Sequence, residues 1–347
     1  MKTKFLYLLG LLLWLSHPCW SQDIHLSQTN MTPLLVNPAN AGAEYDIRAI
    51  LNYRSQWKSV DAPFVTMMAA YDMNFKKPNA SKFGYFAGGI YLFTDKAGTS
   101  NMRTSQANLS VAYHVNLSAK NTLGLGLQGG YFQRSSNTSN LKWGSQYDGY
   151  AYNETYTSGE STNDNLTLGS SDFNSGLVWT YRNDKKYFSG QNVIITTGIS
   201  FHHLTQPSYD YQNITTDKLY NRWIIHSSGN IGLNQSVSVL PYVFYSYQGS
   251  IDEFMFGSNM LYTVKQASSY TANVKGMAIG GGAFYRWNDA VILTLITQYA
   301  NYTFEFSYDI NTSSLNDASG GNGAFELSLQ YVFPSPFGGV KSKSRFN

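Results

Sequence analysis

The chain has 347 residues, of which 13% are charged and 16% are aromatic, and its formal net charge is +3. Globular proteins average about 25% charged residues. This low charge excludes a disordered chain, which needs a high net charge, and a nucleic-acid-binding protein, which needs an excess of Lys and Arg. The mean hydropathy is −0.28 and no long apolar run follows residue 15, which excludes a helical membrane protein. The remaining class is a large β protein.

Residues 1–21 are typical of a secretory signal sequence. A positively charged start precedes an apolar stretch over 5–15, and the small residues at 19 and 21 predict cleavage after Ser21. The alternative is a lipoprotein lipidated at Cys19, which the proline directly before it disfavours. Cleavage removes two of the 24 basic residues and none of the 21 acidic ones, so 22 and 21 remain. It also removes the only cysteine, which excludes disulfides and thiol chemistry in the mature chain.

Residues 22–43 follow the signal and contain Pro33 and Pro38, which disfavour a strand. We expect this segment at the periplasmic mouth of a barrel or folded into its lumen. The barrel itself is expected over 44–333, followed by a basic periplasmic tail over 334–347.

Apolar and polar residues then alternate along the chain. In 302–310, every even position is apolar or aromatic and every odd position is polar, which places the two kinds on opposite faces of a strand. The same alternation predicts fourteen strands, over 45–53, 64–75, 83–94, 101–115, 120–134, 171–182, 191–203, 221–233, 236–248, 252–264, 275–287, 288–300, 302–310 and 322–333.

Many of these strands approach the roughly 9–11 residues that cross a bilayer at a tilt. Some polar faces carry charges, as at Asp72, Glu305 and Glu326. A membrane barrel turns apolar side chains to lipid and polar ones to the lumen. Its external loops are long and its periplasmic turns are short, and the long connections 135–170, 204–220 and 311–321 all follow odd-numbered strands. We therefore predict an all-β, transmembrane antiparallel barrel of about 14 strands with a long external loop.

Residues with catalytic or metal-binding chemistry are few. His202 and His203 are adjacent on a predicted strand, so we expect them on opposite faces, where they cannot easily share a metal. There is no Gly-x-Ser-x-Gly elbow. A lipid-modifying barrel hydrolase using His114 or His226 is the weaker alternative. We expect no enzyme, no cofactor and no metal.

The glycines at 124 and 126 lie inside a predicted strand, where they allow a bend or the close approach of another backbone.

The connection 135–170 combines aromatic residues with Ser, Asn and Gly, a composition suited to adaptable recognition. Its candidate partner-binding residues are Trp143, Tyr147, Tyr150 and Tyr152. The alternative is a merely solvated loop.

Several short motifs occur in a fixed order along the mature chain. They include Asn37-Pro38-Ala39-x-Ala41-Gly42, Asn52-Tyr53-Arg54-x-Gln56-Trp57 and, near the end, Gly323-Ala324-Phe325-Glu326-Leu327-Ser328-Leu329. Together they resemble the PorP/SprF family, outer-membrane proteins of the type IX secretion system of Bacteroidota. The family usually has His before the Glu in the last motif. Here Phe325 stands there, so no role of that His carries over.

The resemblance implies a fourteen-stranded barrel in the outer membrane with a non-enzymatic part in secretion and gliding. It implies binding or surface anchoring of an exported adhesin-type cargo through its C-terminal sorting domain, and contact with periplasmic components of the secretion machinery. Its motifs add Asn37, Pro38, Arg54 and Trp57 as candidate partner-binding residues. The partners would be the lipid bilayer and proteins, with no nucleic acid. The alternative function is an outer-membrane channel for small solutes. The cargo, the loops that contact it and the oligomeric state stay open.

Overall fold

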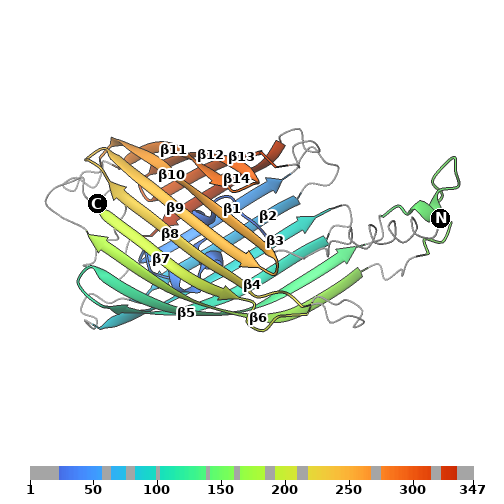
Figure 1. Cartoon of the computed structure of the whole chain (residues 1–347), viewed down its shortest axis with the longest axis horizontal. Helices are drawn as coiled ribbons and strands as arrows, with labels where there is room; N and C mark the ends of the chain where they lie inside the picture. Colours follow the sequence, from blue (N-terminus) through green and yellow to red (C-terminus); the bar gives the residue numbers. More distant parts are fainter. Residues whose placement is uncertain are drawn as a thin grey trace, which may run out of the picture.

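The computed structural model describes residues 23–56, 64–75, 83–98, 102–137, 141–159, 165–183, 192–208, 218–266, 275–313 and 322–333. The expected signal sequence 1–21 and the basic tail 334–347 lie outside the described residues. In the described part, fourteen antiparallel strands close into one barrel (Figure 1). Each strand pairs with its neighbours in the sequence, and the first strand pairs with the last. The predicted fourteen-stranded antiparallel barrel is confirmed.

Every observed strand overlaps one predicted range. The strands are β1 (Ile47–Gln56), β2 (Phe64–Asn74), β3 (Gly84–Ala97), β4 (Met102–Asn116), β5 (Asn121–Asn137), β6 (Asn165–Asn183), β7 (Val193–His202), β8 (Arg222–Gly232), β9 (Val237–Gln248), β10 (Ile251–Lys265), β11 (Met277–Arg286), β12 (Ala290–Tyr299), β13 (Tyr302–Asn311) and β14 (Asn322–Val332). The largest difference is at β5 and β6, whose ladder continues to the pair Asn137–Asn165. Residues 135–137 are all polar and do not alternate, so only main-chain pairing places them in a strand. Residues 165–170 do alternate at Leu166 and Leu168, and the predicted strand began too late, at 171.

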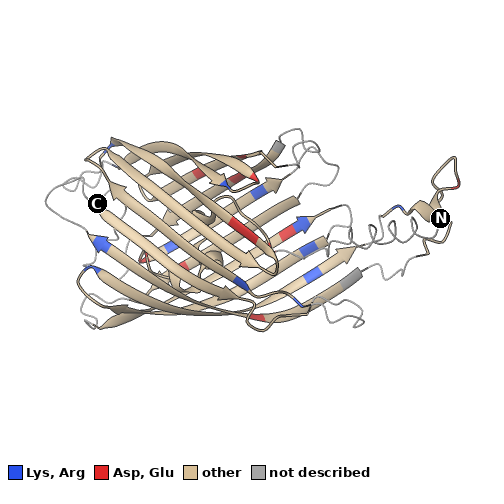
Figure 2. Cartoon of the chain, in the orientation of Figure 1, with Lys and Arg blue, Asp and Glu red and all other residues tan. Residues whose placement is uncertain are grey.

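The two faces of the wall differ as a membrane barrel requires. On β13, Phe304 is 44% exposed and Ile310 is 38% exposed on the outer face, whereas Glu305 is fully buried on the inner face. Figure 2 shows that the strands are mostly free of charge, with Lys, Arg, Asp and Glu at only a few positions. The predicted orientation, apolar outward and polar inward, is therefore present along the wall.

The connections distinguish the two ends of the barrel. The loop end carries the connections that follow odd-numbered strands, namely 57–63, 98–101, 138–164, 203–221, 249–250, 287–289 and 312–321. The turn end carries the connections that follow even-numbered strands, together with the start of β1 and the end of β14. Bacterial barrels place both chain ends and the short turns in the periplasm, so the loop end corresponds to the cell exterior.

Aromatic rings contact one another at both ends of the outer wall. At the loop end, Trp223 lies between Phe201 and Tyr247, with ring centroids 6.3 Å and 6.1 Å apart. At the turn end, Tyr331 lies 4.6 Å from both Tyr302 and Phe333. Such amphipathic rings suit the headgroup levels of a bilayer.

No helix in the part of the chain that the structure describes is long and apolar enough to cross a membrane.

Candidate functional site

The described residues before β1 lie inside the barrel. They form three single turns, η1 (Thr29–Met31), α2 (Pro33–Val36) and η2 (Pro38–Asn40), visible as blue coils within the barrel in Figure 1. Proline begins α2 and η2, where its missing N–H costs no helical bond. Asn37 Oδ1 accepts the backbone N–H of Ala39 at 2.9 Å and so caps η2. We call residues 23–43 the plug and its first part, 23–27, the strap.

Glycines in the barrel wall provide the space for the plug. A methyl group at Gly126 on β5 would overlap the backbone nitrogen of Ala39, and one at the neighbouring Gly176 on β6 would overlap Asn37 Oδ1. On β7, a methyl group at Gly198 would lie 2.6 Å from Asn37 Nδ2. We call Gly126, Gly176 and Gly198 the glycine seat. The close backbone approach that the sequence allowed at Gly126 is that of the plug.

Polar contacts hold the plug in this seat. Asn37 Nδ2 donates to the carbonyl oxygens of Leu177 at 2.9 Å and Ile199 at 3.2 Å. Ser200 Oγ donates to Val36 O at 2.6 Å, and His114 Nε2 lies 2.8 Å from Ala41 O. Since these wall residues belong to β4, β6 and β7, the plug is fixed across several strands at once.

A buried ion cluster anchors the plug on the opposite side of the barrel. Arg54 on β1 contacts Asp309 on β13 at 3.5 Å and Glu326 on β14 at 3.3 Å, and Arg286 on β11 contacts Asp309 at 2.9 Å. Ser27 of the strap donates its backbone N–H to Glu326 at 2.8 Å and its hydroxyl to Asp309 at 2.6 Å. Two guanidinium groups thus face two carboxylates, and Ser27 of the strap donates hydrogen bonds to both carboxylates.

The tip of the strap is held by a second set of ionisable groups. Asp23 Oδ2 lies 2.6 Å from His203 Nε2 and 3.7 Å from Arg222 Nη1, and His203 Nδ1 lies 2.8 Å from Asp172. Burial alone would lower the pKa of His203, but Asp23 and Asp172 raise it to about 9. Burial alone would raise the pKa of Asp23, but His203, with smaller contributions from Arg222 and His202, holds it below its usual range. The Asp23–His203 contact is therefore an ion pair at neutral pH.

The expectation that His202 and His203 point to opposite faces is wrong. His202 Nε2 lies 3.2 Å from Val36 O, and His203 contacts Asp23, so both rings face the plug. The reason is the backbone at His203, whose φ of 58° turns the chain at the end of β7 and breaks the alternation. Among the described residues, no group of three or more His, Cys, Asp or Glu side chains is arranged to hold a metal ion.

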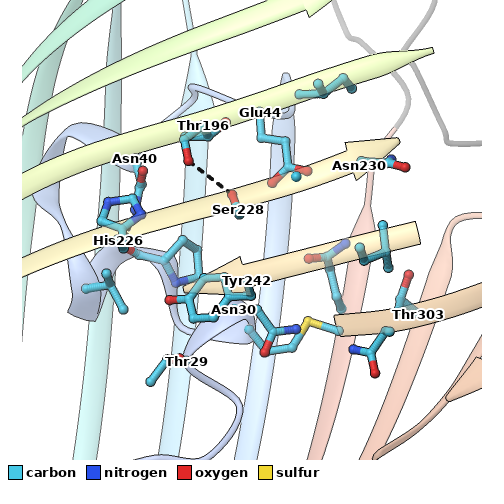
Figure 3. A pocket seen from close by; sticks show the side chains of 18 of the residues that line it. Thr29, Asn30, Asn40, Glu44, Thr196, His226, Ser228, Asn230, Tyr242 and Thr303 are labelled. Atoms are coloured by element: carbon cyan, nitrogen blue, oxygen red, sulfur yellow. Dashed lines mark hydrogen bonds between the residues drawn. The ribbon is translucent and has the colours of Figure 1, made fainter. Parts of the chain in front are cut away.

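In the part of the chain that the structure describes, two cavities lie beside the plug. A turn-end chamber of about 100 Å³ lies between the plug and strands β7–β14. Figure 3 shows Asn30 and Asn40 of the plug and Thr196, His226 and Ser228 of the wall around this chamber. A larger cavity of about 790 Å³, which we call the vestibule, lies at the loop end and is lined by the strap and by inward residues of β1–β5 and β8–β11.

The described part of the long connection, 141–159, forms an ordered unit at the loop end. Gln146 organises it, since its amide accepts the Trp143 N–H at 3.2 Å, donates to Tyr156 O at 3.0 Å and accepts the Tyr152 hydroxyl at 3.2 Å. Tyr147 is 55% exposed and Tyr150 is 94% exposed. Rigid rings on an ordered loop lose little conformational entropy when a partner binds.

The structure separates the sequence-predicted partner-binding residues into two places. Asn37, Pro38 and Arg54 are buried in the lumen, where their contacts are to the chain itself. The four aromatic candidates Trp143, Tyr147, Tyr150 and Tyr152 lie together on the 141–159 unit, and Trp57 lies outside the described residues. Sequence reasoning missed Asp23, His203 and the vestibule. The available signal was charge at inward-facing positions of the predicted strands. The sequence does not show which of these charged residues contact each other.

The fold and the inward ion clusters define an outer-membrane β-barrel with an occupied lumen. The model of the family described as type IX secretion system membrane protein PorP/SprF matches residues 20–331, so the chain belongs to this family. No curated protein matches the sequence.

The chain is also similar in fold to solved outer-membrane barrels. A Pseudomonas aeruginosa FadL homologue is 11% identical, with a TM-score of 0.46 over 86% of this chain and 93% of that chain. BamA from Haemophilus ducreyi lacking POTRA domains 1-3 is 11% identical, with a TM-score of 0.42 over 84% of this chain and 71% of that chain.

Proposed function

We propose that this barrel is a non-enzymatic component of type IX secretion and gliding that binds or anchors an exported adhesin-type cargo through the cargo's C-terminal sorting domain. Membership of the family supports a secretion role in the outer membrane. The observation that carries the binding role is the ordered aromatic unit 141–159 at the loop end, where Tyr150 is 94% exposed.

The lumen also favours a binding role over bulk transport. The plug crosses the barrel and contacts strands on both sides, with the turn-end chamber on one side of it and the vestibule on the other. In this proposal the partner contacts lie at the mouth, at the aromatic unit and the vestibule. Periplasmic components of the machinery would contact the turn end.

Co-purification tests this proposal. The barrel is extracted from outer membranes in mild detergent, and the bound proteins are identified by mass spectrometry. We expect a large secreted protein with a C-terminal sorting domain, and we expect Tyr147→Ala with Tyr150→Ala to reduce its recovery at least tenfold. Tyr220→Ala is the matched control, because Tyr220 is 44% exposed at the same end but lies on another connection. Recovery without such a cargo, or equal loss in the control, would contradict the proposal.

A small-solute channel is the second candidate, supported by the cavities on both sides of the plug. Planar-bilayer recordings distinguish the two. A steady open conductance from the unmodified barrel supports the channel, whereas a closed barrel supports the binding role.

A further inference from the structure

The strap crosses the loop-end mouth in the manner of an extended strand. Its odd-numbered side chains contact the β7–β14 side, where Asp23 meets His203, His25 Nδ1 lies 3.2 Å from Glu253, and Ser27 meets Asp309. Its even-numbered side chains, Ile24 and Leu26, pack against the apolar cluster on β1–β4. This alternation has the period of two that an extended chain produces.

The middle of the strap has no main-chain partner. Among the described residues, the backbone N–H and C=O groups of Ile24, His25 and Leu26 make no hydrogen bond, whereas Asp23 N donates to Gln248 at 3.2 Å and Ser27 N donates to Glu326 at 2.8 Å. An extended segment with unpaired main-chain groups is a template for another strand. The anchored residues at both ends hold this template in place.

The vestibule provides the space for such a strand. Its volume of about 790 Å³ lies at the loop end, where Asp23, Ile24 and His25 of the strap line it together with inward residues of β1–β5 and β8–β11. On the β2–β5 side the lining is mixed in chemistry, with aromatic, hydroxyl, amide and charged groups at Phe64, Thr66, Asp95, Thr104, Gln106 and Arg134. A wall of this kind can accept the varied side chains of a peptide.

We propose that the vestibule binds an extended peptide segment of the exported partner, which pairs with the main chain of Ile24 or His25, the strap residues that line it. The inference rests on the proposed function, and it adds that the partner enters the barrel as an extended peptide. Main-chain hydrogen bonds then supply affinity, and the β2–β5 wall selects side chains, as in other cases of strand addition. A folded surface would not reach the strap, because the strap lies within the mouth and its residues are half-buried or buried.

Amide hydrogen exchange tests the pairing directly. The processed barrel is compared in detergent with and without the exported protein that co-purifies with it. We expect exchange at Ile24 or His25 to slow at least tenfold in the complex, with no change at Leu35 and Val36, whose N–H groups already donate to Thr32 O. A bound partner with unchanged exchange at both Ile24 and His25 overturns the pairing but leaves the proposed function intact. Absence of any co-purifying partner removes both.

A proline scan provides an independent readout. Proline removes the N–H but tolerates extended backbone. Successive N–H groups of an extended chain point to opposite edges. Partner recovery should therefore fall at least tenfold for proline at one of positions 24 and 25, but not at the other. Alanine at each position controls for side-chain loss and should retain the partner. Equal recovery from the two proline variants, or equal loss from the alanine variants, overturns the pairing.

Discussion

Filling the glycine seat should loosen the plug without changing the lipid-facing wall. The perturbation is Gly126→Ala combined with Gly176→Ala, which adds two methyl groups on adjacent strands beneath Asn37 and Ala39. At Gly126 the nearest atoms belong to the plug backbone, which cannot rotate away as a side chain could. The plug must therefore move as a unit.

The size of the effect follows from the packing. Overpacking a filled site costs about 1–3 kcal/mol, so the two methyl groups cost about 2–6 kcal/mol together. At about 1.4 kcal/mol per factor of ten, the displaced plug becomes roughly 30-fold to 20,000-fold more populated. In the seated plug Leu34 and Val36 are buried against other parts of the wall, and each contributes about 1.5–3 kcal/mol to retention. We therefore expect frequent displacement and not permanent release.

Two measurements follow the displacement. In planar bilayers, the double variant should show open events at least tenfold more often than the unmodified barrel. A single cysteine at the fully buried Thr32, introduced by Thr32→Cys, should react with a maleimide at least tenfold faster in the double variant. This probe is specific because Cys19, the only natural cysteine, lies in the predicted signal.

Gly88→Ala is the matched control for these measurements. Gly88 is on β3, and its nearest atom to an added methyl group is Ser110 O at 3.5 Å, an ordinary contact away from the plug. This variant should behave as the unmodified barrel does. The reasoning would be refuted if the double variant stays closed and its cysteine stays protected, or if Gly88→Ala opens the barrel equally.

The remaining predictions concern the ion clusters and the outer wall. Arg54→Ala should destabilise the barrel by about 3–5 kcal/mol in urea unfolding, because two carboxylates lose a buried partner; an unchanged midpoint would contradict this. The raised pKa of His203 means that its ion pair with Asp23 is complete below pH 6.5 and is lost as pH rises through about 9. Exchange at the bonded Ser27 amide, corrected for intrinsic rates, should rise across that range, and His203→Gln should remove the step. Leu109→Arg should cost about 2–4 kcal/mol if its 60% exposed side chain faces the bilayer centre, and Leu109→Ala is its control.

The sequence alone determined the wall of this barrel. Alternation in 302–310 assigns each residue to one face, because successive side chains of a strand point in opposite directions, and charge at Glu305 identifies the inner one. The same reasoning located fourteen strands and their connections. It failed at 135–137, where polar residues without alternation pair only because the neighbouring strand continues beside them. At 165–170 Leu166 and Leu168 do alternate, but the stretch was assigned to the long connection.

What fills the barrel, and which residues meet there, depends on contacts between distant parts of the chain. Asp23 and His203 are 180 residues apart, and Ser27 and Asp309 are 282 apart, yet each pair lies within hydrogen-bond distance. Such contacts depend on barrel closure and on the path of the plug, and local periodicity carries no information on either. The candidate partner-binding residues predicted from the sequence therefore included Asn37 and Arg54 together with the aromatic loop residues. Closure of the barrel places the first two in the lumen and the others at the mouth. The glycines show the same division: the sequence marked Gly126 as a place for close approach, and the fold supplied the backbone of Ala39.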